Sequence, residues 1–175
     1  ATKPIGEVDE RQLVSMMVGR PIDSMFPKAE AAIGETILEV SGLNRGRQVR
    51  DISFALRKGE ILGIGGLVGS GRTELALTLF GMTPATSGTI RLDGREVRIT
   101  APQQALQLGI AYVPEDGGLE GLVKPMAIRK NVSMATLDQV SSGIFIRAGE
   151  EARRAAAAVK RLSVRCRSSA QPVGE

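Results

Sequence analysis

Apolar and polar residues alternate along several short segments between residues 36 and 113, which is typical of β-strands. The alternation is clearest where Ile52, Phe54 and Leu56 share one side of a segment. A shorter apolar run that stops at Pro114 predicts a buried strand. Strands are expected at residues 36–40, 49–56, 60–65, 89–93, 96–99 and 110–113, with a hairpin turn at Gly94-Arg95.

Other segments space their apolar residues as helices do. Asp9 can cap a first helix, in which Leu13, Met16 and Met17 form an apolar stripe, and Pro102 suits a first helical turn. Helices are expected at residues 10–18, 72–80, 101–108, 127–137 and 149–163, a linker at 20–35 and a loop at 115–125. Strands that come mainly first and helices that come mainly last predict a mixed α/β fold.

Glycine is concentrated in one place: six of the 21 glycines lie within residues 59–71. Residues 66–73, GLVGSGRT, match the phosphate-binding pattern G-x-x-x-x-G-K-[ST] except at the lysine. An apolar segment precedes them and an amphipathic helix follows, as the motif requires. Glycines let backbone N–H groups surround phosphate oxygens, and a helix N-terminus favours anions. The predicted nucleotide-binding residues are Gly66, Gly69, Ser70, Gly71, Arg72, Thr73 and Glu74.

Two of these side chains have their own expected chemistry. Arg72 is expected to reach the β- and γ-phosphates, and the Thr73 hydroxyl is expected to ligate Mg²⁺. Because a guanidinium is larger and forked, phosphate binding should survive the exchange of lysine for arginine, whereas tight γ-phosphate positioning should suffer. Tight packing of a glycine-rich turn is the structural alternative. A dinucleotide fingerprint, suggested by Asp93, fails because Val68 or Glu74 stands at its third glycine position.

The composition excludes several kinds of site. The 175 residues include no histidine, which excludes a Ser-His-Asp triad, a histidine metal ligand and a histidine general base. A single cysteine, Cys166, gives neither an internal disulfide nor zinc-ligand spacing, so a reducing compartment is expected. No apolar run approaches ~18 residues and no signal-peptide pattern is present, so we expect a soluble cytoplasmic protein.

The net charge of +4 comes from one region. Residues 147–167 contain seven Arg or Lys and two Glu, and without them acidic residues outnumber basic ones by one. A basic helix can bind nucleic acid or anionic lipid. Only Phe145 among the few aromatics lies near it, so base stacking would be poor. The region is therefore predicted to be a solvated helix face, with no nucleic-acid partner.

Further motifs follow the glycine-rich loop in a recognisable order. They are VRDISF at 49–54, RKGEILG at 57–63, the loop at 66–75, TSGTIRLDG at 86–94, IAYVPED at 110–116 and Gly121-Leu122. Together they resemble the second nucleotide-binding domain of the tandem ATPase subunits of bacterial ABC importers for monosaccharides such as ribose, xylose and galactose. That family often has arginine in this loop. The likeness covers nearly the whole chain.

The resemblance implies an α/β P-loop NTPase fold of the ABC type, with an antiparallel β subdomain and part of a helical subdomain. Residues 1–35 would be the end of a preceding domain and a linker, 36–115 the P-loop core with its β subdomain, and 116–175 the partial helical subdomain. Within the Q-loop region at 110–116, Glu115 stands where glutamine is more general. Its carboxylate can ligate Mg²⁺ but also repels a γ-phosphate. On spacing alone the region can also be a Walker B strand, although Pro114 interrupts it.

The activity that the resemblance implies is ATP hydrolysis with Mg²⁺, coupled to sugar import. The implied partners are transmembrane permease subunits, which the helix after Arg129 would face, and a sugar-binding protein. The implied location is the inner face of the cell membrane. Because no aromatic lies within residues 43–50, adenine recognition is expected to be weak.

The family continues beyond this point into a signature motif, a Walker B strand with a catalytic glutamate, and a switch histidine. We therefore expect a truncated domain that contains no catalytic residue and does not turn over ATP alone. Ile61, Leu62 and Ile64 should lack a neighbouring strand, which favours self-association. The alternative function is a non-catalytic, permease-interacting or regulatory module with a degenerate P-loop.

Overall fold

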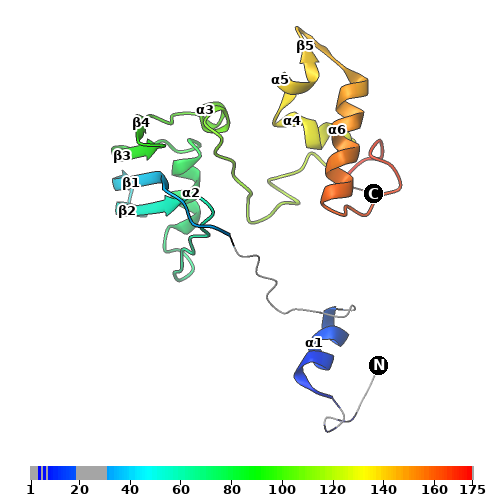
Figure 1. The fold of residues 1–175 in the computed structure, drawn as a ribbon, viewed down its shortest axis with the longest axis horizontal. Helices are drawn as coiled ribbons and strands as arrows, with labels where there is room; N and C mark the ends of the chain where they lie inside the picture. The colour runs from blue at the N-terminus through cyan, green and yellow to red at the C-terminus, as the bar shows by residue number, and fades with distance from the viewer. Residues whose placement is uncertain (1–3, 5, 7, 19–30, 175) are drawn as a thin grey trace. The chain divides into compact units, whose positions relative to one another are not determined.

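The structure is a computed structural model that describes residues 4, 6, 8–18 and 31–174 (Figure 1). The chain divides into two compact units, Ala1–Gln104 and Ala105–Glu175. Most of the linker predicted at residues 20–35 lies outside the described residues, and residues 31–35 contain neither helix nor strand. Among the described helices, none has the length and apolar character needed to cross a membrane.

The first helix is capped as the sequence predicts. Helix α1 (Glu10–Val18) follows Asp9, whose Oδ1 accepts a hydrogen bond of 2.7 Å from the backbone N–H of Gln12. A side-chain acceptor at this position satisfies one of the donors that a helix N-terminus leaves unpaired. The apolar stripe of Leu13, Met16 and Met17 is exposed.

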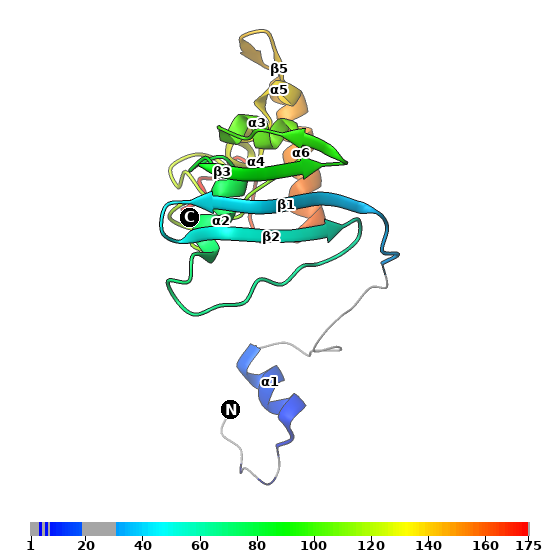
Figure 2. The same cartoon turned by 90° about the vertical axis from the view of Figure 1, so that its left-hand side faces the viewer.

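The first unit contains an antiparallel sheet of four strands (Figure 2). The strands lie in the order β2-β1-β3-β4, and every neighbouring pair is antiparallel. Four of the predicted strands are confirmed, with the first extended by five residues and the hairpin turn moved to Asp93-Gly94. The bounds are β1 (Thr36–Arg45), β2 (Val49–Arg57), β3 (Ser87–Leu92) and β4 (Arg95–Val97).

A bulge in β1 decides which of its side chains face the core. Pairing with β2 shifts register between Val40 and Leu43, where Gly42 has φ +57°. The Gly42 N–H donates to Ser53 Oγ (2.8 Å) instead of continuing the ladder. The shift lets Val40 and Leu43, three residues apart, both be buried. Strict alternation would have pointed Gly42 inward instead.

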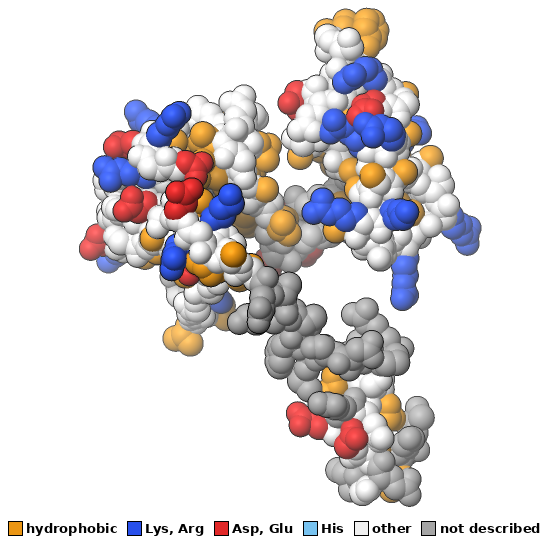
Figure 3. Space-filling view, viewed as in Figure 1, with side chains coloured by type: hydrophobic (Ala, Val, Ile, Leu, Met, Phe, Trp, Pro, Cys, Tyr) orange, Lys and Arg blue, Asp and Glu red, His pale blue; other side chains and the backbone are white. Residues whose placement is uncertain are grey.

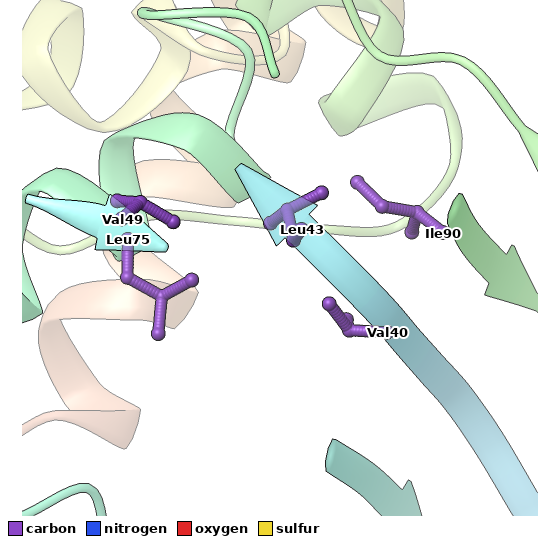
Figure 4. Close-up of a cluster of buried hydrophobic side chains, with 5 residues drawn as sticks. All are labelled: Val40, Leu43, Val49, Leu75 and Ile90. Atoms are coloured by element: carbon purple, nitrogen blue, oxygen red, sulfur yellow. The ribbon is translucent and has the colours of Figure 1, made fainter. Parts of the chain in front are cut away.

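Helix α2 (Arg72–Leu79) covers one face of this sheet (Figure 1). Its Leu75 completes the core, and Figure 4 shows the five buried side chains that form it, from three strands and one helix. Burial of this kind contributes about 25 cal/mol per Å² of apolar surface, so the core holds α2 on the sheet. A short helix, α3 (Pro102–Gln107), follows the last strand and confirms the helix predicted at 101–108. The five buried side chains of the cluster between α2 and the sheet are Val40, Leu43, Val49, Leu75 and Ile90.

Two predicted strands are wrong. Residues 60–65 and 110–113 contain no strand, although both are apolar. A strand exists only through hydrogen bonds to a neighbour, and within the described residues neither segment has a strand partner. Ile61 is 97% exposed and Val113 is 86% exposed, so neither segment is buried as its composition suggested.

The second unit is mainly helical. The helix predicted at 127–137 is two helices, α4 (Ile128–Met134) and α5 (Leu137–Val140), because the chain leaves helical geometry at Thr136 (φ −137°, ψ 41°). The helix predicted at 149–163 is confirmed as α6 (Ala148–Arg161). A small hairpin that the sequence pattern missed, β5 (Ser141–Ser142) with β6 (Phe145–Ile146), joins α5 to α6. The chain's single tyrosine, Tyr112, belongs to this unit.

The C-terminal segment supplies the cap of α4. This helix has no side-chain cap, but the N–H groups of Ile128 and Arg129 donate to the carbonyls of Gln171 (3.0 Å) and Ser169 (2.8 Å). Two of the donors at the helix N-terminus are thereby satisfied by backbone 40 residues or more further along the chain. The C-terminal segment of the second unit is thus tied to the start of α4 by hydrogen bonds.

A polar contact joins α4 to α6 in the second unit. The Ser133 hydroxyl donates to Glu151 Oε1 (2.8 Å), and both residues are buried. Arg129 Nε lies 3.8 Å from the other carboxylate oxygen of Glu151. A buried carboxylate needs such partners because desolvation of an unpaired charge is costly. Val140 of α5 and Ala155 of α6 are fully buried in the same unit.

The exposed face of α6 is rich in arginine, and Figure 3 shows Lys and Arg side chains on the second unit in blue. Arg153 and Arg154 both donate to the Glu150 carboxylate, at 2.7–2.9 Å. These hydrogen bonds lower the pKa of Glu150 from 4.5 to about 2. The predicted solvated face is therefore partly neutralised by its own acid.

Glu150→Gln is expected to destabilise the second unit slightly at pH 7, since exposed ion pairs contribute little. The folded-state pKa of Glu150 is depressed, so its contribution is present above pH 4.5 and is lost as the pH falls towards 2. Thermal unfolding followed by circular dichroism should show wild type and variant converging over that interval. Glu120→Gln, at an exposed loop position, is the matched control and should leave the transition unchanged. A difference that persists unchanged at pH 2 would contradict the assignment.

Candidate functional site

The glycine-rich loop runs directly into the N-terminus of α2. Gly71 is the N-cap residue, with φ +91°, and it offers no side-chain acceptor. The first helical hydrogen bond runs from Leu75 N–H to the Gly71 carbonyl (2.8 Å). The N–H groups of Arg72, Thr73 and Glu74 precede that bond, as in the first turn of any helix. This end of a helix carries partial positive charge and attracts anions.

The rest of the loop is compact. Its backbone turns through a hydrogen bond from Ser70 N–H to the Leu67 carbonyl (3.1 Å), and Gly69 has φ +79°. A Cβ added to Gly66 would lie 2.5 Å from Ser70 Oγ and 3.6 Å from Arg72 Cδ. The side chains of Ser70 and Arg72 therefore pass close to Gly66, and a larger residue there would require the Ser70 hydroxyl to move. A loop with little side-chain bulk and an arginine at its end suits a phosphate group.

The structure reveals a neighbour of the loop that the sequence did not single out. The Gln48 side-chain amide donates to Glu74 Oε1 (2.9 Å), and its backbone carbonyl lies close to Gly71. Gln48 belongs to the turn between β1 and β2, which precedes the loop by about twenty residues. No sequence pattern links these positions, because the contact depends on how α2 packs on the sheet.

The predicted site residues divide between the two units. Gly66 to Glu74 form one continuous loop and first helical turn in the first unit. Thr73 is exposed on that turn. Glu115 is an exposed residue of the second unit. Within the part of the chain that the structure describes, no three acidic or cysteine side chains are grouped to hold a metal ion.

The loop's context is confirmed on one side only. The helix predicted after the loop is present as α2, whereas the strand predicted before it is absent. Leu67 and Val68, at the tip of the loop, are exposed as well. The helix end is thus ordered by packing of Leu75, and the segment before the loop is not held by a sheet within the described residues.

Comparison with known proteins decides the family. Residues 49–172 match the ABC transporter family. The chain is a member of the ABC transporter family. It is 45% identical over 96% of its length to ribose import ATP-binding protein RbsA 2 of Rhizobium johnstonii. It is 52% identical over 78% of its length to ribose import ATP-binding protein RbsA 3 of Rubrobacter xylanophilus.

A third relative of this ABC chain carries a broader name. It is a putative ribose/galactose/methyl galactoside import ATP-binding protein of Rhizobium etli, 40% identical over 99% of the chain. The chain spans about a third of the length of these curated relatives. The activity, substrates and partners of such whole proteins therefore extend beyond what these residues alone display.

Solved structures confirm the ABC ATPase fold. CbiO1 of Clostridium perfringens, part of the ABC transporter complex CbiONQ, matches with a TM-score of 0.58 and 21% identity, covering 79% of this chain and 54% of its own. A bacterial Atm1-family ABC exporter with ATP bound matches with a TM-score of 0.52 and 21% identity, covering 94% and 29%. At this identity the likeness concerns the fold.

Proposed function

We propose that the chain is part of the ATP-binding component of a sugar ABC importer, whose whole protein hydrolyses ATP to drive carbohydrate uptake. The observation that carries the proposal is the glycine-rich loop that ends at the N-terminus of α2, in an ABC chain whose relatives are named as ribose or galactoside import ATP-binding proteins. The proposed partners are permease subunits and a sugar-binding protein. The proposed location is the cytoplasmic face of the membrane.

In this proposal the loop residues have distinct roles toward the nucleotide. Backbone N–H groups from Gly66, Gly69, Ser70 and Gly71 and from the first turn of α2 bind phosphate oxygens, and the Arg72 guanidinium donates to them as well. The Thr73 hydroxyl ligates Mg²⁺, and Glu115 supplies a carboxylate near the metal. When bound, Mg²⁺ neutralises part of the phosphate charge.

Two finer expectations are also proposals. These 175 residues alone should not turn over ATP. They contain no histidine, and the roles proposed above for the loop residues and Glu115 include no base that orients the attacking water. Self-association of the chain is supported by the exposed apolar side chains of Ile61, Leu67 and Val68.

The proposal is tested by calorimetric titration with Mg-ATP. Wild type should release heat, and Arg72→Ala should weaken binding ~10- to 100-fold, the loss typical of a charged hydrogen-bonding group. Arg95→Ala, an exposed arginine on β4, removes the same charge and should bind as wild type does. Phosphate release should stay at the protein-free level throughout.

Three results would contradict these statements. No heat at millimolar Mg-ATP would favour the alternative, a permease-interacting or regulatory module with a degenerate P-loop. The arginine at position 72 supports this alternative, because a larger, forked guanidinium positions a γ-phosphate less tightly than a lysine does. Equal losses in the two arginine variants would reduce the effect to net charge. Phosphate release that Thr73→Ala abolishes would refute the expected lack of turnover.

A further inference from the structure

The turn between β1 and β2 touches the N-terminus of α2 at two points. At the cap, a Cβ on Gly71 would lie 2.4 Å from the Gln48 carbonyl oxygen and 3.2 Å from Gln48 Cβ, so the two backbones are in close contact. One turn further, Gln48 Nε2 donates to Glu74 Oε1 (2.9 Å). The same residue therefore fixes both the cap of the helix and the side chain of its third residue.

Glu74 occupies a position from which its carboxylate could compete with a phosphate. It is the third residue of α2, and a glutamate at that place can fold back to accept the N–H of the cap residue. The partial positive charge of the helix end also attracts a carboxylate. The donors that Glu74 could reach are the ones that the proposed function assigns to the nucleotide. Its carboxylate is instead bonded to Gln48.

We propose that Gln48 is a positioning residue that holds the Glu74 carboxylate aside and so keeps the N-terminal N–H groups of α2 open to the phosphates. The inference rests on the proposed function, since it assumes a phosphate ligand at this helix end. A glutamine suits the role because its amide donates a hydrogen bond without adding charge. Gln48 is exposed, so its contribution to the core is small.

Mg-ATP titration of four proteins tests the idea: wild type, Gln48→Ala, Glu74→Ala and the double variant. Gln48→Ala should weaken binding ~3- to 10-fold, the value of a lost hydrogen bond that also releases a competitor. The double variant should bind as tightly as wild type, because the competing carboxylate is gone while the backbone N–H of residue 74, the group assigned to the phosphates, is kept. Gln103→Ala, the same substitution at an exposed position of α3, is the matched control and should change nothing.

A purely structural role of Gln48 predicts the opposite for the double variant, which would then bind as weakly as Gln48→Ala or more weakly. That result would overturn the inference, as would unchanged binding by Gln48→Ala. The rescue by Glu74→Ala is thus the decisive comparison, because loss of packing cannot be restored by removing a second side chain.

A second measurement needs no nucleotide. At pH 7, the backbone amide proton resonance of Gly71 should lie further downfield in Gln48→Ala than in the double variant, because the released Glu74 carboxylate accepts the Gly71 N–H. Glu74→Ala alone should not show this downfield shift relative to wild type, in which Glu74 is bonded to Gln48. Its absence from Gln48→Ala would overturn the inference even if ATP binds. Its presence in a chain that shows no heat with Mg-ATP would leave the positioning role standing and refute the proposed function alone.

Discussion

Gly71→Ala is expected to reduce Mg-ATP affinity by more than ~30-fold. Alanine at φ +91° costs about 1–2 kcal/mol. Its Cβ would also lie 2.4 Å from the carbonyl oxygen and 3.1 Å from the carbonyl carbon of Gln48, which are backbone atoms that cannot rotate away. Relief requires the turn or the loop to move, at a further cost of about 1–3 kcal/mol. That movement displaces the N–H groups at the start of α2.

Calorimetric titration with Mg-ATP measures this loss, and Gly46→Ala is the matched control. Gly46 also has positive φ, +59°, and belongs to the same turn as Gln48, but a Cβ there meets nothing within 4 Å. Gly46→Ala should therefore lower the free energy of unfolding and leave the Mg-ATP affinity within about twofold of wild type. Similar affinities for Gly71→Ala and wild type would show that the cap of α2 does not contact the nucleotide.

Gly88→Ala is expected to lower the free energy of unfolding of the first unit by about 2–5 kcal/mol, the sum of the conformational and steric costs. Gly88 is in β3, at φ +95°, opposite the bulge of β1. A Cβ there would lie 2.4 Å from the Gly42 carbonyl oxygen and 2.5 Å from Leu43 Cα. The β1–β3 pair would have to separate where it carries Leu43 into the core.

Gly94→Ala separates the steric cost from the conformational one. Gly94 has φ +74° in the turn between β3 and β4, and nothing lies within 4 Å of an added Cβ. The free energy of unfolding of the Gly94→Ala variant should fall by about 1 kcal/mol, which is the conformational cost alone. Urea unfolding followed by circular dichroism measures both variants. Equal decreases in the free energy of unfolding of Gly88→Ala and Gly94→Ala would mean that the bulge of β1 moves to accommodate the added Cβ at no energetic cost.

The elements that sequence predicted well are those whose partners are close in the chain. The β3–β4 hairpin and α2 follow from local alternation, turn residues and helical spacing, and the Asp9 cap follows from one side chain. The strands predicted at residues 60–65 and 110–113 are wrong because an apolar run indicates burial but does not show that a neighbouring strand is available for hydrogen bonding. Ile61 illustrates this, since its composition predicts a core strand and it is almost fully exposed.

The site shows the same division between local and distant information. The spacing of Gly66, Gly71 and Thr73 was sufficient to predict the loop and its entry into a helix, since these residues lie close together in the chain. The roles of the individual residues toward a nucleotide stay predictions. Gln48 could not be predicted, because its hydrogen bond spans 26 residues and exists only once α2 lies on the sheet.

The division into two units has a practical consequence for spectroscopy. The chain contains no tryptophan, and its single tyrosine, Tyr112, belongs to the second unit. Tyrosine fluorescence therefore reports the unfolding of that unit alone, whereas circular dichroism sums both. With Gly88→Ala, a dichroism transition that moves while the emission transition stays in place would demonstrate that the two units melt separately, and a single Tm would then describe neither.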